Sequence, residues 1–151
     1  MRILLQVVKS ASVEIEGEIV ASISKGYLLL VGFTEGDNLE IAKKMAEKVC
    51  KSRLFQDENG KTNLSIRDVN GEILSVSQFT LYGDMSQGNR PSFFKAMPQE
   101  KAAPLYQQFY NYLHSIYPDS SSGVFHADMK VSLINDGPFT MLFDSRELFS
   151  K

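Results

Sequence analysis

The hydrophobic pattern of the chain changes from strand-like to helical near Asp37, and this change constrains the fold more than any other feature. Met1–Val8 and Tyr27–Phe33 are largely apolar runs, which are typical of buried strands. Between them, Ser12–Ser24 alternates around the turn-like Glu16-Gly17-Glu18, which predicts a β-hairpin. After Asp37 the apolar positions follow helical spacing. We therefore expect strands and helices to pack in layers.

Two amphipathic helices are expected to cover the strands. Asp37 precedes Glu40 by three residues, a capping-box spacing that predicts the start of the first helix. The second helix is expected from about Pro98 to Tyr117, with Pro104 in its first turn or at a kink. Strands dominate the remainder of the sequence. These elements predict a compact mixed α/β layer domain.

Composition limits the class of protein. A chain of 151 residues fits one domain, residues 1–151, with a sizeable core. The single cysteine excludes an internal disulfide framework and suits a reducing compartment. No signal peptide and no apolar run of about 20 residues is evident, so we expect a cytoplasmic protein without membrane contact.

The net charge of −2 restricts any nucleic-acid contact to a local patch or a few phosphates. Lys44, Lys48 and Lys51 lie on the polar face of the first expected helix. They form either an ordinary solvated face or a patch that contacts phosphates. The sequence leaves both interpretations open.

The common catalytic and cofactor motifs are absent from the sequence. His114, His126 and Cys50 show no metal-ligand spacing, so no metal is expected. There is no GxSxG elbow and no GxGxxG or Walker loop, so no nucleotide cofactor is expected either. A Ser-His-Asp triad assembled in space stays open, because triads do not require sequence proximity.

Two short segments instead place small polar groups among apolar, strand-like residues. The first is Ser77-Gln78-Phe79-Thr80-Leu81, at the end of a strand expected to begin at Ile73. On a strand, its alternate side chains would face opposite sides of the sheet. Polar groups in such surroundings either bond to neighbouring backbone or have a function.

The second segment is Asn135-Asp136-Gly137-Pro138-Phe139-Thr140. It joins two expected strands, Lys130–Ile134 and Phe139–Asp144. Its Gly-Pro bond is either trans, in a turn or on an edge strand, or cis. A cis bond would align successive carbonyls, which could then hold an ammonium group beside a rigid backbone wall.

Together, the two segments resemble the paired signature of the D-aminoacyl-tRNA deacylases. The resemblance covers nearly the whole chain, because further matching segments flank both signatures. These are Gln6, Ser10-Ala11-Ser12-Val13, Lys25-Gly26, Asn63-Leu64-Ser65, Arg90-Pro91-Ser92-Phe93, Pro104-Leu105-Tyr106 and Ala127-Asp128-Met129-Lys130-Val131-Ser132. The chain departs from the family pattern at Val7, His126 and Gln87-Gly88-Asn89.

The resemblance implies a mostly antiparallel, barrel-like sheet with two helices, and a homodimer without cofactor or metal. It implies hydrolysis of the ester at the 3′ end of D-aminoacyl-tRNA and of mischarged glycyl-tRNA. A cis Gly-Pro motif of one subunit would enter the pocket of the other and reject L-amino acids. The implied catalytic residues are Ser77, Gln78, Phe79 and Thr80, the implied substrate-binding residues are Gly137 and Pro138, and the implied supporting residues are Met129, Phe139 and Thr140.

The chemical step has two versions within this family. In one, Thr80 is a nucleophile; in the other, the 2′-hydroxyl of the tRNA assists while side chains position the substrate. The second is the favoured view of the family, and the sequence agrees with it because it offers no obvious base for Thr80. In both, backbone N–H groups near Phe79 and Thr80 would stabilise the oxyanion. A dimeric binding module without turnover and a serine or threonine esterase for small esters are the competing interpretations.

Overall fold

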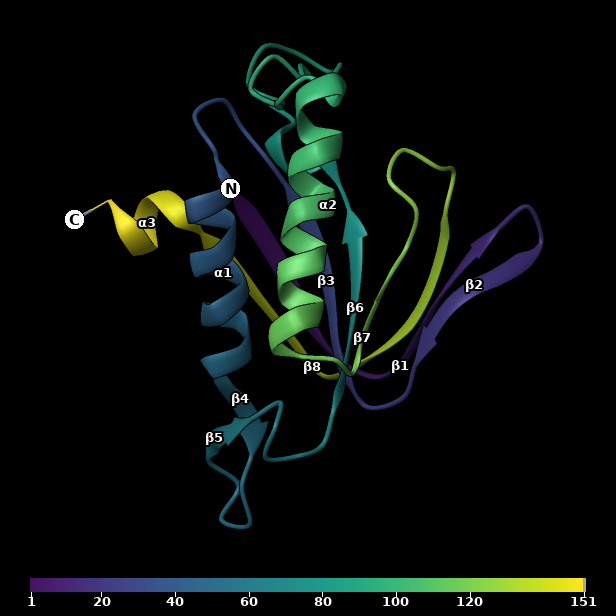
Figure 1. Ribbon diagram of the computed structural model, residues 1–151, viewed down its shortest axis with the longest axis vertical. Helices are drawn as coiled ribbons and strands as arrows, with labels where there is room; N and C mark the ends of the chain where they lie inside the picture. Colours follow the sequence, from purple (N-terminus) through teal and green to yellow (C-terminus); the bar gives the residue numbers. More distant parts are fainter. Residues whose placement is uncertain (151) are drawn as a thin grey trace.

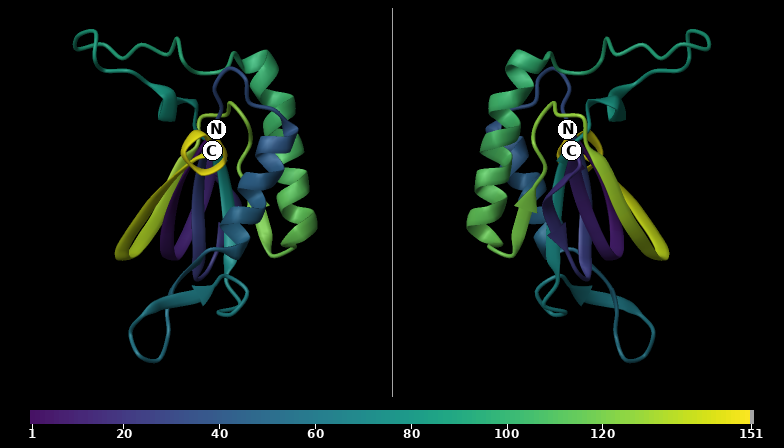
Figure 2. Two further views of the ribbon diagram at one scale, coloured as in Figure 1. Left: turned by 90° about the vertical axis from the view of Figure 1, so that its left-hand side faces the viewer. Right: turned by 90° about the vertical axis from the view of Figure 1, so that its right-hand side faces the viewer.

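A mixed sheet forms the body of the protein, and two helices lie side by side on one of its faces (Figures 1 and 2). The computed structural model describes residues 1–150. The strands are β1 (Arg2–Ile15), β2 (Glu18–Ile23), β3 (Gly26–Gly32), β4 (Arg53–Gln56), β5 (Thr62–Ser65), β6 (Glu72–Ser77), β7 (Ser120–Ser122) and β8 (Lys130–Asp144). The helices are α1 (Leu39–Lys51), α2 (Gln99–Ile116), the short α3 (Ser145–Phe149) and the 3-10 turn η1 (Phe79–Tyr82).

The long strand β1 organises the sheet. Its first half pairs antiparallel with β3, its second half pairs antiparallel with β2, and β8 runs antiparallel along most of its length. The sheet continues from β3 to β6 and β7 through parallel pairings, in the order β2-β1-β3-β6-β7. The expected β-hairpin is confirmed, with Glu16 and Gly17 at its turn. The expected mixed α/β fold, with a mostly antiparallel, barrel-like sheet and two main helices, is confirmed.

Strand β3 is buried on both faces, which explains its continuous apolar sequence. Tyr27, Leu29 and Val31 face the helices and belong to the larger core, whereas Leu28 belongs to a second core on the other face. Helix α1 supplies apolar side chains to the larger core at helical spacing, and α2 does the same. These side chains are Ala42, Met45, Ala46 and Val49 from α1, and Leu105, Phe109 and Leu113 from α2.

The predicted capping box at Asp37 is wrong by one residue. Asn38 is the N-cap of α1, and its side-chain oxygen accepts a hydrogen bond of 3.0 Å from the N–H of Ile41. The Asp37 carboxylate instead lies 2.8 Å from the Met1 ammonium and accepts the N–H of Thr34 at 2.7 Å. The buried Met1 ammonium therefore binds the carboxylate that would otherwise cap the helix.

Two strand boundaries also differ from the prediction. Strand β6 ends at Ser77, and the chain then turns into η1, so the expected alternation of faces up to Leu81 does not occur. Residues 130–144 form one strand, β8, rather than two. No helix within residues 1–150 is long and apolar enough to cross a membrane.

A buried chain of hydroxyl groups fastens α2 to the sheet. The Tyr106 hydroxyl lies 2.9 Å from Ser75 Oγ on β6 and 2.7 Å from Ser122 Oγ at the end of β7. Burial raises the pKa of the Tyr106 phenol, and the hydrogen bond with Ser122 opposes this rise. Because Ser122 immediately precedes the loop of residues 123–129, the tyrosine fixes the start of that loop.

We predict that Gly26→Ala strongly destabilises the protein. At this position β3 and β6 approach so closely that a Cβ atom would lie 1.8 Å from the Glu72 carbonyl oxygen, which is backbone and cannot rotate away. Overpacking of this kind costs about 1–3 kcal/mol or more. Urea unfolding measures the loss, and Ser24→Ala, at an exposed neighbouring position, serves as the control. An unchanged unfolding free energy for Gly26→Ala would contradict the close approach.

We predict that Tyr106→Phe lowers the melting temperature. The substitution leaves the buried Ser75 hydroxyl without its partner, which costs about 1–3 kcal/mol, while Ser122 keeps its bond to the Gly123 carbonyl. For a domain of this size, each kcal/mol corresponds to roughly 2–4 °C. Tyr110→Phe is the matched control, because Tyr110 lies on the same helix and its single bond to the Ser120 carbonyl is only partly buried. Equal shifts in the melting temperature of both variants would show that the hydrogen bonds of Tyr106 contribute no more stability than the single bond of Tyr110.

Candidate active site

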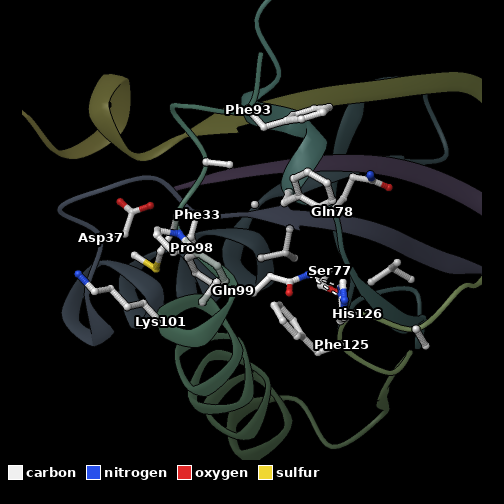
Figure 3. Close-up of a pocket in the computed structure, with 18 of the residues that line it drawn as sticks. Phe33, Asp37, Ser77, Gln78, Phe93, Pro98, Gln99, Lys101, Phe125 and His126 are labelled. Carbon is white, nitrogen blue, oxygen red and sulfur yellow. Dashed lines mark hydrogen bonds between the residues drawn. The ribbon is translucent and has the colours of Figure 1, made fainter. Parts of the chain in front are cut away.

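A cavity of about 1020 Å³ opens between the ends of β3 and β6 on one side and the start of α2 on the other (Figure 3). Its lining comes from four parts of the chain that are distant in sequence. The lining residues lie within residues 31–37, 76–79, 93–102 and 125–131. A cavity of this size, with mostly apolar walls and few polar groups, is typical of a small-molecule site.

The first predicted segment forms part of the cavity wall. Ser77, Gln78 and Phe79 line the cavity, but Thr80 does not. The N–H of Gln78 donates to the Val31 carbonyl at 2.7 Å, which ties the end of β6 to β3. The Gln78 side-chain amide donates to Thr80 Oγ1, so these two polar groups bond to each other rather than to neighbouring backbone.

Gly32 makes this arrangement possible. A Cβ atom there would lie 2.8 Å from the Gln78 carbonyl oxygen and 3.2 Å from Leu81 Cβ. The lack of a side chain therefore allows η1 to fold back against the end of β3. The glycine was not predicted as a site residue, because its role depends on a contact between two strand ends.

Aromatic rings gather in and around the cavity. Phe79 and Phe93 meet edge to face with their ring centroids 5.0 Å apart, and Phe33, Phe94 and Phe125 also line the cavity. Aromatic faces of this kind stack well on nucleic-acid bases. Of these rings, only Phe79 was predicted as a site residue. Phe93 was quoted in a segment that matches the family and Phe33 in an apolar run, both without a role, and Phe94 and Phe125 belong to segments without a recognisable motif.

The loop of residues 123–129 forms the wall opposite Gln78. His126 has a positive φ of 67°, and its imidazole contacts the side-chain amide of Gln99 at the start of α2 (Figure 3). Met129, predicted to support the site, lines the cavity from the same loop. The contact between His126 and Gln99 joins the middle of the loop to α2, and Tyr106 fixes the start of the loop.

The segment of residues 83–96, which we call the arm, leaves the body of the protein and returns to it (Figure 2). Phe93, Phe94 and Ala96, on the returning part of the arm, line the cavity. Backbone hydrogen bonds of 2.8 Å in both directions join Asp84 to Ser92. Hydrogen bonds from Ser86, together with the nearby Lys95 ammonium at 3.6 Å, hold the pKa of Asp84 below its usual value. Asp84 is thus a carboxylate at neutral pH and pairs with Lys95.

The second predicted segment does not line the cavity. It lies on β8, where Gln6 pairs with Thr140 and Val8 pairs with Asn135, so residues 136–139 bulge out opposite Val7. The Gly137–Pro138 bond is cis, and both residues are exposed.

Asn135 holds the base of this bulge. Its side-chain oxygen accepts the N–H of Phe139 at 2.8 Å, and its amide nitrogen donates to Thr140 Oγ1 at 2.9 Å. Asn135 belongs to the predicted segment but was not predicted as a site residue. Its polar side chain beside a Gly-Pro pair is the signal that points to such a bridge.

The structure therefore brings together only some of the predicted residues within one chain. Ser77, Gln78, Phe79 and Met129 meet at the cavity, whereas Gly137, Pro138, Phe139 and Thr140 lie on β8 outside it. Within residues 1–150, no three His, Cys, Asp or Glu side chains are close enough to hold a metal ion.

Known proteins resemble this chain over nearly its whole length. A family model described as D-Tyr-tRNA(Tyr) deacylase matches residues 4–144. A D-aminoacyl-tRNA deacylase of Lactobacillus gasseri is 54% identical over 144 residues, which cover 95% of this chain and 99% of the relative. The corresponding protein of Thermosipho africanus is 49% identical over 149 residues, covering 99% of this chain and all of the relative.

Solved structures show the same fold. One, described as c-Myc DNA Unwinding Element Binding Protein, has a TM-score of 0.89 at 37% identity and covers 95% of this chain and 98% of its own. Another, a probable eukaryotic D-amino acid tRNA deacylase, has a TM-score of 0.83 at 17% identity with the same coverage, and this likeness concerns the fold alone. The family model and the curated relatives span nearly the whole chain, and the chain therefore belongs to the D-aminoacyl-tRNA deacylase family, a family of hydrolases.

Proposed function

We propose that this protein hydrolyses the ester of D-aminoacyl-tRNA in the cavity beside Ser77–Phe79, and that a second copy of the chain completes the site. Membership of the family supports the reaction. The proposal that a second copy completes the site rests on the separation of the two signatures. One lines the cavity, and the other forms an exposed bulge on β8 outside it.

A two-fold pair of chains would reunite the signatures. In such an arrangement each surface meets its own copy, so the bulge of either chain can enter the cavity of the other. Apolar side chains on both sides of the bulge support an interface at β8, because Ile134, Met141 and Leu142 are all exposed in the single chain.

The bulge would select the substrate through its backbone. The carbonyl groups of Gly137 and Pro138 would accept hydrogen bonds from the α-ammonium group of the substrate. The same backbone would collide with the side chain of an L-amino acid, while a D-side chain would point away. Glycine has no side chain to collide, so mischarged glycyl-tRNA would also enter.

The cavity would then stabilise the transition state. The N–H groups of Phe79 and Thr80 begin η1, and the first N–H groups of a helix lack partners within it. In the proposed site they would donate to the oxyanion as the ester carbonyl is attacked. Gln78, which lines the cavity, would orient the water or the substrate.

Thr80 is better suited to positioning than to attack. Its hydroxyl accepts a hydrogen bond from the Gln78 amide, which is not a base, and Thr80 does not line the cavity. Activation of a threonine requires an adjacent general base. Assistance by the 2′-hydroxyl of the tRNA fits this geometry better.

The experiment that tests the proposed function compares three substrates. D-Tyr-tRNA, L-Tyr-tRNA and a small aryl ester are each incubated with the protein, and ester loss is measured. Selective hydrolysis of D-Tyr-tRNA supports the proposal. Tight binding without release would support a binding module, and hydrolysis of the small ester that depends on Thr80 would support a conventional esterase.

We predict that Thr80→Ala retains measurable hydrolysis of D-Tyr-tRNA, with a modest loss of rate. The substitution removes the hydroxyl that orients Gln78, together with the γ-methyl group of Thr80. If Thr80 were the nucleophile, kcat would fall by several orders of magnitude, about 10⁶ in the best-studied case. Thr80→Ser is the control, since it keeps the hydroxyl. A covalent acyl-enzyme trapped on Thr80 would contradict this prediction.

We predict that Gly137→Ala sharply lowers D-Tyr-tRNA hydrolysis without unfolding the protein. Gly137 has a φ of 140°, which an L-residue rarely adopts, and a Cβ atom there would lie 3.0 Å from the Phe139 nitrogen. The bulge would therefore change shape. Asp136→Ala, at the exposed neighbouring position, is the control, and a thermal melt checks the fold.

Mixing two inactive variants tests the shared site directly. In a mixed pair of Gly137→Ala and Gln78→Ala chains, one of the two sites combines an intact cavity with an intact bulge. Activity should therefore return on mixing and rise toward a quarter of the wild-type value, because half of the pairs are mixed and each has one intact site. A mixture that stays inactive after exchange of subunits would rule out a site shared between chains.

A further inference from the structure

An aromatic side chain stands almost fully exposed at the mouth of the cavity. Phe94 lines the cavity, yet 95% of its surface is accessible to solvent. Its neighbour Phe93 is engaged with Phe79, with ring centroids 5.0 Å apart. Phe94 is therefore the one ring of this group within residues 1–150 that offers nearly its whole surface at the rim.

The exposure of Phe94 is built into the backbone on both sides. Before it, Ser92 is fixed by its backbone bonds to Asp84, and Ser92 Oγ accepts the N–H of Phe94 at 3.4 Å. After it, the Lys95 carbonyl accepts the Thr34 hydroxyl at 2.5 Å. The backbone on both sides of the ring is thus held by hydrogen bonds.

The arm carries a positive charge outside any ion pair. Lys95 pairs with Asp84, which leaves the positive charge of Arg90 uncompensated on the arm among the described residues. Of the acidic residues that line the cavity, Asp37 is paired with the Met1 ammonium and Asp128 with Lys130, while Lys101 adds a positive charge at the start of α2. Arg90 would therefore attract the phosphates of a strand that passes along the arm.

We infer that Phe94 stacks on an unpaired base at the 3′ end of the tRNA, namely the base that immediately precedes the terminal adenosine. This inference rests on the proposed function, in which the cavity takes the terminal aminoacylated nucleoside. The single strand must then leave through the cavity mouth, where Phe94 is the exposed ring. Base–aromatic stacking tolerates any base and contributes binding without hydrogen bonds, which suits an end that all tRNAs share.

Binding of uncharged RNA tests the inference without any turnover. The tetranucleotide ACCA and adenosine alone are titrated against the wild type and three variants. Phe94→Ala should weaken ACCA binding about tenfold, the order of magnitude of one lost base–aromatic stack, and leave adenosine binding unchanged. Phe94→Tyr should restore ACCA binding. Met85→Ala, also on the arm and 59% exposed but outside the cavity lining, should bind like the wild type.

Kinetics give the second measurement. With D-Tyr-tRNA, Phe94→Ala should raise KM about tenfold with little change in kcat, and with the 3′-O-D-tyrosyl ester of adenosine neither constant should change. Equal losses on both substrates, or unchanged ACCA binding, would overturn the role of Phe94. Failure of the wild type to hydrolyse D-Tyr-tRNA would instead refute the proposed function, while the ACCA titration still decides the stacking contact.

Discussion

The burial of β3 on both faces is the constraint on which the rest of the structure depends. One face of the strand carries the larger core beneath α1 and α2, and the other carries the second core. Because β3 lies between β1 and β6 and pairs with both, its position determines where these two neighbouring strands lie in the sheet. At its own end, the Val31 carbonyl holds Gln78, and Gly32 admits η1. The packing of the larger core therefore also positions the strand ends that line the cavity.

Much of this fold could be predicted from the sequence, because its strongest signals are local. The apolar run of Tyr27–Phe33, the hairpin turn at Gly17 and the helical spacing of α1 each specify an element without reference to the others. The predictions were wrong where a contact between distant parts of the chain determines the local structure. Asp37 has the right spacing for a cap but is taken by the Met1 ammonium, and β6 ends at Ser77 because the chain turns there into η1.

The candidate site shows the same division. Both signature segments were found in the sequence, because small polar residues in apolar surroundings are unusual. The rest of the cavity could not be found in this way. Gln99 and Phe94 belong to residues 93–102 and Phe125 to the loop of residues 123–129, and these segments meet at the cavity although they are distant in sequence. Their roles follow from geometry, so a residue type or a spacing could not have indicated them.

The bulge on β8 also has a consequence for how the chain behaves in a crowded solution. Within residues 1–150, β8 pairs only with β1, so its other edge is an open template for strands of unrelated chains. Proline has no N–H to offer such a strand, and the four bulged residues interrupt the regular ladder at the middle of the edge. A foreign strand could therefore pair only with a short stretch on either side. The segment proposed to recognise the substrate would also protect the protein from amyloid-like strand addition.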